Sequence, residues 1–393
     1  MIERLQQEFM NLYSTESKPR VFFAPGRINL IGEHIDYNGG LVLPAAISYG
    51  TYALVKKRND SIVRFFSNNF KEDGIIEVDL NDVKYDSAHT WANFPKGMIS
   101  ILKDQGFMID TGLDILYHGN IPNSAGLSSS ASIEMVTGAL LKESLDLSID
   151  LETLVKLGQV VENEYIGVNS GIMDQFAVGF GKKDHAILLD CKNLEHEYAP
   201  IILNEHVIMI IHTNKQRALS ESKYNERRQQ CENALIDLQE QLEINNLCMV
   251  APNLFEETKH LIKCETNRLR AHHVVYEQAR TKKAFQRLKA GDLNAFGKLM
   301  NDSHYSLKHY YEVTGIELDT IVEAAQSQKG VIGARMTGAG FGGCAIAIVK
   351  KAQTEQFKEN VNKIYLEKVG YEASFYEAAI GDGARELKGV EIG

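Results

Sequence analysis

PNSAGLSSSASIE, Pro122 to Glu134, joins two different kinds of sequence. Before it, LDILYHG at 113–119 has the alternation of a strand, and after it a helical pattern runs from about Ser129 to Ser144. The segment therefore predicts a strand, a short loop of small residues and a long helix that begins within the serine run. Strands that alternate with helices are typical of α/β and α+β folds.

This loop has the composition of an anion site. It places free backbone N–H groups and the positive end of a helix around Gly126 to Ser130, where a phosphate would be stabilised. Three consecutive hydroxyls, Ser128 to Ser130, add contacts for phosphate or Mg²⁺. The alternative is an ordinary serine N-cap, which needs only one serine. No G-K-[ST] sequence occurs in the chain, so the loop is not a Walker A motif.

Upstream lies a polar, glycine-rich stretch, GRINLIGEHIDYNGG, at Gly26 to Gly40. Its polar side chains cannot all be buried without partners. Carboxylates and an imidazole exchange hydrogen bonds with vicinal hydroxyls, which a sugar presents. A polar surface loop is one alternative. A metal site from Glu33, His34 and Asp36 is another, although neighbours on an extended chain point to opposite faces.

Downstream, MTGAGFGGC at Met336 to Cys344 contains a G-x-G-x-x-G pattern formed by Gly338, Gly340 and Gly343. A dinucleotide-binding motif of this kind follows a strand and opens a helix. Here the glycines lead instead into an apolar strand, CAIAIV at 344–349. We interpret the glycines as positions where the backbone approaches another loop or a ligand closely.

The whole chain divides into two halves of different character. Its 393 residues are enough for two or three domains of about 150 residues. Predicted strands dominate up to about residue 200, and the segment 221–310 is mostly helical. We therefore predict two closely packed domains, 1–200 and 201–393, with a cleft between them.

Bulk composition limits the partners. A formal charge of -10, from 52 acidic and 42 basic side chains, disfavours nucleic acid and anionic membranes. The chain has five widely spaced cysteines and no C-x-x-C pair, which indicates reduced thiols. No apolar stretch approaches the 18 to 20 residues of a membrane span, and the first residues lack a signal-peptide pattern. We expect a cytoplasmic protein.

Taken together, the three motifs resemble the GHMP kinases, and the first resembles galactokinases specifically. GIMDQF at 171–176 and SKYNERR at 222–228 also fit galactokinases, so the resemblance extends over nearly the whole chain. It implies an N-terminal domain similar to ribosomal protein S5 and a ferredoxin-like α+β C-terminal domain, with the active site between them. It also implies transfer of the γ-phosphoryl group of MgATP to the C1 hydroxyl of α-D-galactose, by a chain that we expect to be a monomer.

The resemblance implies roles for single residues. Those that would hold galactose are Glu33, His34, Ile35, Asp36, Gly171 and Tyr224, with Asp36 at the 3- and 4-hydroxyls. Those that would wrap the ATP phosphates are Ser124, Ala125, Gly126, Leu127, Ser128, Ser129 and Ser130, with Ser67 near the nucleotide. Ser130 and Glu162 would coordinate Mg²⁺. Asp174 would accept the proton of the C1 hydroxyl, and Arg27 would neutralise charge on the phosphoryl group.

Several of these residues have plainer interpretations. Glu162, in the helical stretch VVENEY, would by default face solvent. Asp174 could cap a helix or pair with Arg27, and Tyr224 could be a half-buried packing residue. Ser124 departs from the family, which usually has glycine there. If that position needs a positive φ, serine costs about 1 kcal/mol.

Two other functions are compatible with the same motifs. One is a kinase for a different galactose derivative, such as N-acetylgalactosamine or galacturonate. The other is a catalytically silent sugar sensor. A sensor should have lost part of the serine run or the base, whereas Ser128 to Ser130, Glu162 and Asp174 are all present.

Overall fold

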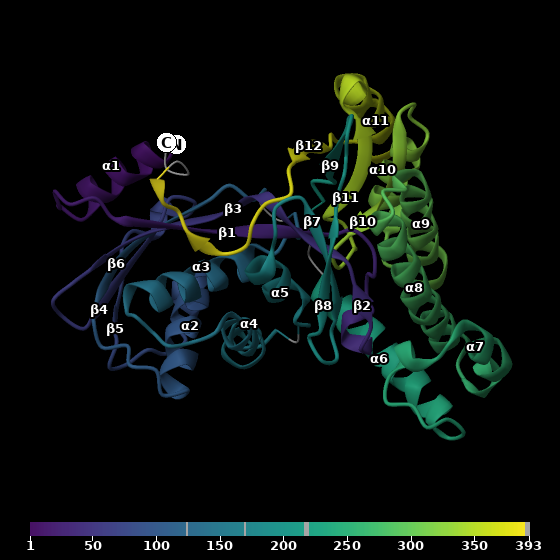
Figure 1. Ribbon diagram of the computed structural model, residues 1–393, viewed down its shortest axis with the longest axis horizontal. Helices are drawn as coiled ribbons and strands as arrows, with labels where there is room; N and C mark the ends of the chain where they lie inside the picture. The colour runs from purple at the N-terminus through teal and green to yellow at the C-terminus, as the bar shows by residue number, and fades with distance from the viewer. Residues whose placement is uncertain (123–124, 169, 216–219, 390–393) are drawn as a thin grey trace.

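The computed structural model describes residues 1–122, 125–168, 170–215 and 220–389 (Figure 1). Within this part of the chain, the largest sheet has six strands in the order β13-β1-β3-β6-β4-β5. β4 and β6 are parallel, and the other neighbours are antiparallel. The strands are β1 (Arg20–Asn29), β3 (Pro44–Lys57), β4 (Ile62–Ser67), β5 (Ile76–Asp79), β6 (Leu113–Gly119) and β13 (Arg385–Glu386).

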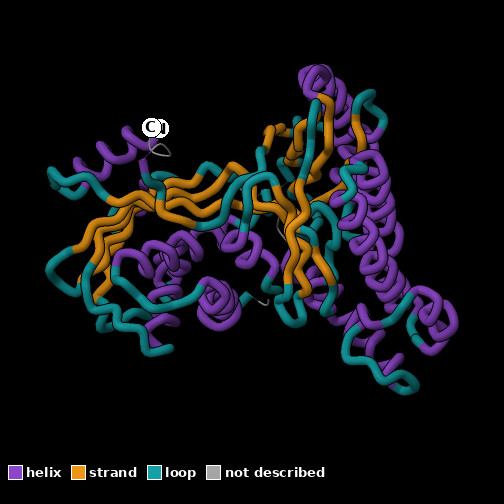
Figure 2. The backbone as a smooth tube through the Cα atoms, in the orientation of Figure 1, coloured by secondary structure: helices purple, strands orange, loops and turns teal. Residues whose placement is uncertain are grey.

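Helices cover both faces of this sheet (Figures 1 and 2). Side chains alternate between the faces of a strand. Accordingly, Phe22 packs in the main core, whereas Val21 and Phe23 pack with the amphipathic helix α1 (Ile2–Leu12) on the other side. The main-core face is covered by α2 (Asn93–Asp104), α3 (Ser129–Ser144), α4 (Leu151–Val160) and α5 (Met173–Phe180).

Two smaller sheets follow. The first joins β2 (Leu41–Val42), β7 (His185–Asp190) and β8 (His196–Pro200). The second is antiparallel in the order β10-β11-β9-β12, from β10 (Val331–Thr337), β11 (Cys344–Lys350), β9 (His206–His212) and β12 (Ser374–Ala378). Its β11 is buried at every position but the last, as expected for its apolar sequence.

The remaining helices lie beside the four-stranded sheet or extend away from it (Figure 1). They are α6 (Ser220–Gln239), α7 (Pro252–Thr258), α8 (Glu265–Lys289), α9 (Leu293–Ser306), α10 (Gly315–Gln326) and α11 (Thr354–Val369). α9 and α10 contact β10, and α8 packs against α6 and α9. In the described residues, no helix combines the length and apolar character that crossing a membrane requires.

The sequence predicted most elements, and α3 and β6 have the predicted bounds. It missed β8, β10 and β13, which are short or interrupted by polar residues. β13 pairs with β1 of the first sheet, so the chain returns to its starting domain near its end. The division at residue 200 stays a prediction.

Candidate active site

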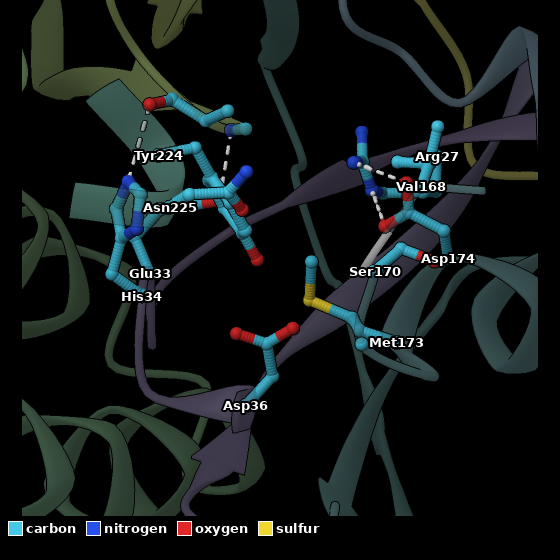
Figure 3. Close-up of a pocket in the computed structure, with 13 residues that line it drawn as sticks. Arg27, Glu33, His34, Asp36, Val168, Ser170, Met173, Asp174, Tyr224 and Asn225 are labelled. Carbon is cyan, nitrogen blue, oxygen red and sulfur yellow. Dashed lines mark hydrogen bonds and ion pairs between the residues drawn. The ribbon is translucent and has the colours of Figure 1, made fainter. Parts of the chain in front are cut away.

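A cavity of about 310 Å³ lies where residues from distant parts of the chain meet (Figure 3). Its walls come from β1 and the loop after it, the segment leading into α5, the start of α6 and the turn between β10 and β11. The lining residues are Arg27, Glu33, His34, Asp36, Val168, Ser170, Gly171, Met173, Asp174, Tyr224, Asn225, Gly338 and Ala339. Seven of the eight predicted catalytic and sugar-binding residues line this cavity, and the exception is Ile35.

Arg27 and Asp174 form an ion pair on one wall (Figure 3). Arg27 Nε donates to Asp174 Oδ1 at 2.8 Å, and Arg27 Nη2 donates to Asp174 Oδ2 at 2.7 Å. Two parallel bonds of this kind fix both groups in one plane. Arg27 Nη1 also donates to the carbonyl oxygen of Gly126 at 2.9 Å. The guanidinium therefore joins the cavity wall to the loop before α3.

Ser128 occupies the N-cap position of α3 but does not cap the helix with its side chain. Its φ of 63° is left-handed, a conformation that costs an L-residue about 1–2 kcal/mol. Its Oγ donates instead to Asp174 Oδ2 at 2.5 Å. The plain N-cap interpretation of the serine run is therefore wrong for Ser128, which connects α3 to the ion pair.

Asp36 faces the ion pair across the cavity, and its carboxylate points into the open space (Figure 3). Burial raises the pKa of Asp36 to about 6, and the carboxylates of Asp174 and Glu33 add to the shift. Gly171 passes so close that a Cβ there would overlap Asp36 Oδ2. Glycine is required at 171 by this approach. A perturbed carboxyl group on a cavity wall is typical of a functional site.

Glu33 is buried, and partners from the C-terminal half hold its carboxylate. Arg335 Nη1 donates to Glu33 Oε2 at 2.7 Å, and the backbone N–H of Gly338 donates to Glu33 Oε1 at 2.8 Å. Asn29 Nδ2 donates to Oε2 as well, at 3.1 Å. Burial raises the pKa of Glu33, and the Arg335 charge opposes that shift. Glu33 therefore connects the two halves of the chain in addition to lining the cavity.

A second cavity, of about 230 Å³, lies on the other side of the serine run. Its apolar walls include the rings of Phe70, Trp91 and Tyr117, and Phe70 and Trp91 are almost parallel, with an interplanar angle of 8°. Aromatic rings offer faces on which a planar heterocycle can stack. Ser67, Ser129 and Ser130 line the same cavity. Its other lining residues are Thr51, Asn69, Phe94, Gly119, Ile121 and Ile133.

The side chains of Ser130 and Glu162 bring a hydroxyl oxygen and a carboxylate oxygen together beside this cavity. Ser130 Oγ donates to Glu162 Oε1 at 2.6 Å. Glu162 lies in the π-helical turn η4 (Val161–Ile166) that continues α4, and such turns are frequent at functional sites. The alternative interpretation, in which Glu162 faces solvent, is wrong, because this residue is only 7% exposed. Hydroxyl and carboxylate oxygens are ligands that suit Mg²⁺.

Other predicted residues support the site from outside the cavities. The side chains of Ile35, Ala125 and Leu127 are buried in the core. The carbonyl oxygen of Leu127 accepts a 3.1 Å hydrogen bond from Arg27 N. The contacts predicted for these three residues stay predictions, and Ser124 lies outside the described residues. Over the described ranges, no three His, Cys, Asp or Glu residues could hold a metal together, which disfavours the Glu33–His34–Asp36 metal site.

The glycine-rich turn at 338–343 belongs to a hairpin between β10 and β11, which confirms that it is not a dinucleotide motif. Gly338 and Gly340 both have positive φ. A Cβ at Gly338 would lie 3.1 Å from the carbonyl oxygen of Gly126, and one at Gly340 would overlap the backbone of Val313. The predicted close approach to another loop is therefore confirmed: Gly338 approaches the loop before α3, and Gly340 approaches the segment between η7 (Leu307–Tyr311) and α10.

Sequence reasoning missed a buried pair behind the site, Glu134 and Gln175. Gln175 Nε2 donates to Glu134 Oε2 at 3.0 Å, and both side chains are fully buried. Burial raises the pKa of Glu134 well above its usual value, and Glu162 adds to the shift. This hydrogen bond joins α3 to α5. Glu134 lies one turn after Ser130 in α3, and Gln175 directly follows Asp174 in α5. A glutamate inside the apolar run of ASIEMV was the available signal.

The sequence of this chain is similar to those of known protein families and curated proteins. A galactokinase galactose-binding signature matches residues 7–57, and the GHMP kinase N-terminal and C-terminal domain families match residues 93–182 and 282–367. The galactokinase of Ligilactobacillus salivarius is 54% identical over 98% of this chain and 99% of its own. That of Staphylococcus carnosus is 52% identical over 99% of this chain and all of its own.

Solved structures are also similar to this chain. The crystal structure of Lactococcus lactis galactokinase complexed with galactose has a TM-score of 0.95 to this chain, with 49% identity over 98% of this chain and 100% of its own. A mevalonate kinase, 21% identical over 92% of this chain and 99% of its own, shares the fold with a TM-score of 0.63. The two halves therefore have the N-terminal and C-terminal folds of GHMP kinases. With matches of this extent along its whole length, the chain belongs to the galactokinase family of ATP-dependent sugar kinases.

Proposed function

We propose that this chain transfers the γ-phosphoryl group of MgATP to the C1 hydroxyl of α-D-galactose, giving galactose 1-phosphate and ADP. One observation carries the proposal: the Ser128–Asp174–Arg27 cluster lies between the first cavity and the N-terminal end of α3. An acceptor in the cavity and a phosphate at the helix end would meet at this cluster. Phosphoryl transfer depends mostly on such positioning and on charge stabilisation.

The first cavity suits galactose. Asp36 offers a carboxylate that can accept hydrogen bonds from the vicinal 3- and 4-hydroxyls. Glu33, His34 and Tyr224 supply further polar groups, and Gly171 leaves room beside Asp36. The curated relatives are named galactokinases, and the Lactococcus lactis structure holds galactose, which supports the same sugar here.

Asp174 would accept the proton of the C1 hydroxyl. Its Oδ2 accepts from both Arg27 Nη2 and Ser128 Oγ, whereas its Oδ1 accepts from Arg27 Nε. A carboxylate oxygen has two lone-pair positions. Oδ1 therefore keeps one of them for the sugar proton. In the reaction, the C1 oxygen forms its bond to the γ-phosphorus, the bond from that phosphorus to the β–γ bridging oxygen breaks, and the proton moves to Asp174.

Arg27 and the end of α3 would stabilise the transferring group. The guanidinium charge opposes the negative charge that spreads over the phosphoryl oxygens, and the first N–H groups of α3 face an anion in the same way. The aromatic second cavity would hold the adenine base, with Ser67 nearby.

The Ser130–Glu162 pair fits Mg²⁺, because a hydroxyl oxygen and a carboxylate oxygen lie 2.6 Å apart beside the proposed nucleotide cavity. Mg²⁺ usually takes one or two protein oxygens and completes its shell with water and substrate phosphates. When bound, the ion would neutralise charge on the β- and γ-phosphates.

A coupled ADP-release assay tests this function. Galactose, glucose, N-acetylgalactosamine and mevalonate are compared under identical MgATP concentrations. Glucose differs from galactose in the orientation of the 4-hydroxyl, so it leaves the Asp36 carboxylate partly unpaired. We expect kcat/KM for galactose to exceed that for glucose by about tenfold to a hundredfold, since a buried unpaired group costs about 1–3 kcal/mol.

The outcomes separate the alternatives. Equal rates on galactose and glucose would contradict the role of Asp36. A preference for N-acetylgalactosamine would assign the enzyme to that derivative. Galactose binding without ADP release would indicate a sensor.

A further inference from the structure

His34 has both ring nitrogens hydrogen-bonded. Its Nε2 lies 3.2 Å from the carbonyl oxygen of Ala339, and its Nδ1 lies 2.8 Å from the hydroxyl of Tyr37. A carbonyl oxygen only accepts, so Nε2 must carry a hydrogen. Burial lowers the pKa of His34 to about 3, so the ring carries no second proton near neutral pH. Nδ1 is then an acceptor.

This assignment sets the direction of a longer chain of bonds. Because Nδ1 accepts, the Tyr37 hydroxyl donates to it. The Tyr37 oxygen then accepts from the Tyr311 hydroxyl, 2.7 Å away, and the Tyr311 oxygen accepts from the Cys231 thiol at 3.1 Å. We call these four residues, Cys231, Tyr311, Tyr37 and His34, the relay.

The phenol and thiol groups of the relay stay protonated near neutral pH. Burial raises the pKa of the Tyr37 and Tyr311 phenols well above their usual value, and it raises the pKa of the Cys231 thiol to about 11. Tyr311 and Cys231 are almost fully buried. Each group of the relay is therefore neutral at physiological pH, and each has one hydrogen to donate.

The relay also joins elements that are far apart in sequence. Cys231 lies in α6, Tyr311 ends the π-helical turn η7 (Leu307–Tyr311), and Ala339 lies in the turn after β10. The Tyr311 ring packs against two imidazoles, with its centroid 4.9 Å from that of His34 and 4.6 Å from that of His273.

The backbone of His34 is strained, and hydrogen bonds outside the relay hold it. Its φ is 61°, in the left-handed region, where a non-glycine residue costs about 1–2 kcal/mol. Asn38 Nδ2 donates to the His34 carbonyl oxygen at 3.1 Å, and His273 Nε2 donates to that of Glu33 at 3.0 Å. Backbone and side chain are thus both held from outside the cavity.

We infer that the Ala339 carbonyl and the Tyr37 hydroxyl together hold His34 as the Nε2–H tautomer, with Tyr311 and Cys231 orienting the Tyr37 hydroxyl. The cavity then meets a hydrogen-bond donor at this point, and no acceptor. The inference rests on the proposed function for its ligand, a galactose hydroxyl oxygen that shares the Nε2 hydrogen with Ala339. Tyr37, Tyr311 and Cys231 do not line the first cavity. They are positioning residues that act through His34.

Nitrogen NMR of the protein labelled with ¹⁵N-histidine tests the tautomer without any substrate. The chain has twelve histidines, and loss of a signal in His34→Gln assigns the one of interest. We expect a protonated Nε2 and an unprotonated Nδ1 throughout the neutral pH range. Tyr37→Phe removes the donor to Nδ1, so it should shift the Nδ1 signal, while the Ala339 carbonyl still accepts from Nε2. A protonated Nδ1 or a cationic ring in the wild type would overturn the inference.

Kinetics test the consequence for the ligand. Tyr37→Phe should raise the KM for galactose about tenfold, since an unpaired buried group costs about 1–3 kcal/mol. The KM for ATP should stay within twofold. Tyr311→Phe leaves Tyr37 able to donate, so the tautomer should persist and the KM for galactose should rise less. Tyr310→Phe removes a neighbouring phenol outside the relay and is the matched control.

The two readouts also separate this inference from the proposed function. A wild-type chain that releases no ADP with galactose would contradict the proposed function and leave the NMR test intact. A Tyr37→Phe variant with a wild-type His34 spectrum and a wild-type KM for galactose would overturn the relay, whatever the sugar.

Discussion

Arg27 and Asp174 are 147 residues apart in sequence, yet two parallel hydrogen bonds of 2.8 and 2.7 Å join the guanidinium to the carboxylate. The proposed base and the proposed charge-stabilising group are therefore one structural unit. Removing either partner leaves the other charged and without its main contact in a partly buried wall. Their variants should not be independent.

Asp174→Asn keeps the size of the side chain but removes its charge and its ability to take a proton. We expect kcat to fall by about 10²- to 10⁴-fold, the usual contribution of a general base. The dissociation constant for galactose, measured calorimetrically, should change by less than about tenfold, because the variant keeps Asp36 and the other groups that we propose bind the sugar. Arg27→Ala and the double variant, measured alongside, should show losses that do not add. Normal binding with near-wild-type turnover would remove Asp174 from its role as base.

Ser130→Ala and Glu162→Ala test the metal assignment. Each variant should raise the Mg²⁺ concentration needed for half-maximal rate, because each removes one of the two proposed oxygen ligands. Galactose binding without nucleotide should be nearly unchanged, since neither side chain lines the first cavity. A Mg²⁺ titration of the steady-state rate measures the effect. Wild-type Mg²⁺ dependence in both variants would mean that other groups hold the ion.

The raised pKa of Asp36 predicts that galactose binds more tightly as the pH rises. Near pH 6, about half of the Asp36 carboxyls in the free protein are protonated. The ionised form accepts hydrogen bonds from two hydroxyls, so bound galactose favours it and lowers its pKa. The dissociation constant should therefore fall about tenfold between about pH 5 and pH 7, since one pKa unit corresponds to a factor of ten.

Calorimetric titrations in the absence of nucleotide give this profile directly. Asp36→Asn cannot ionise, so its weaker binding should be independent of pH over the same range. A profile that keeps its slope in Asp36→Asn would assign the titration to a different group.

Gly171→Ala tests the close approach between residue 171 and Asp36. The added Cβ overlaps Asp36 Oδ2, so the carboxylate must move. We expect the KM for galactose to rise by at least about tenfold, because a misplacement of about 1 Å can cost a hundredfold. The KM for ATP should be unaffected. Gly381→Ala is the matched control, since a Cβ there meets its nearest neighbour at an ordinary 3.6 Å. An unchanged galactose KM in Gly171→Ala would show that Asp36 does not bind the sugar where we place it.

Trp91 is the single tryptophan of the chain, and it lines the second cavity. If adenine binds against the aromatic walls of this cavity, ATP or ADP should change the intrinsic tryptophan emission in a saturable way. Galactose alone should leave the emission nearly unchanged, because Trp91 does not line the first cavity. Trp91→Phe, which keeps an aromatic wall, supplies the background. Nucleotide that saturates the enzyme in the rate assay without altering the emission would place the base elsewhere.

Patterns in the sequence predicted most of the local structure and the residue types of the main site. Apolar periodicity and the serine run predicted α3 with its bounds, and the strand before it, because helices and strands follow from patterns within a few residues. The motifs also supplied Arg27, Asp36 and Asp174, all of which line one cavity.

The partners that hold these residues are visible only in the folded chain. β10 carries Arg335 in its middle, and a charge there hides the strand pattern. Arg335 is nevertheless fully buried, because Glu33, 302 residues away, neutralises it. Tyr311 likewise looks like any tyrosine at a helix end until the fold brings it to Tyr37, 274 residues away. A buried charge or hydroxyl is stable only with a partner. Which distant residue supplies that partner depends on how the two halves pack, and the local sequence does not contain that information.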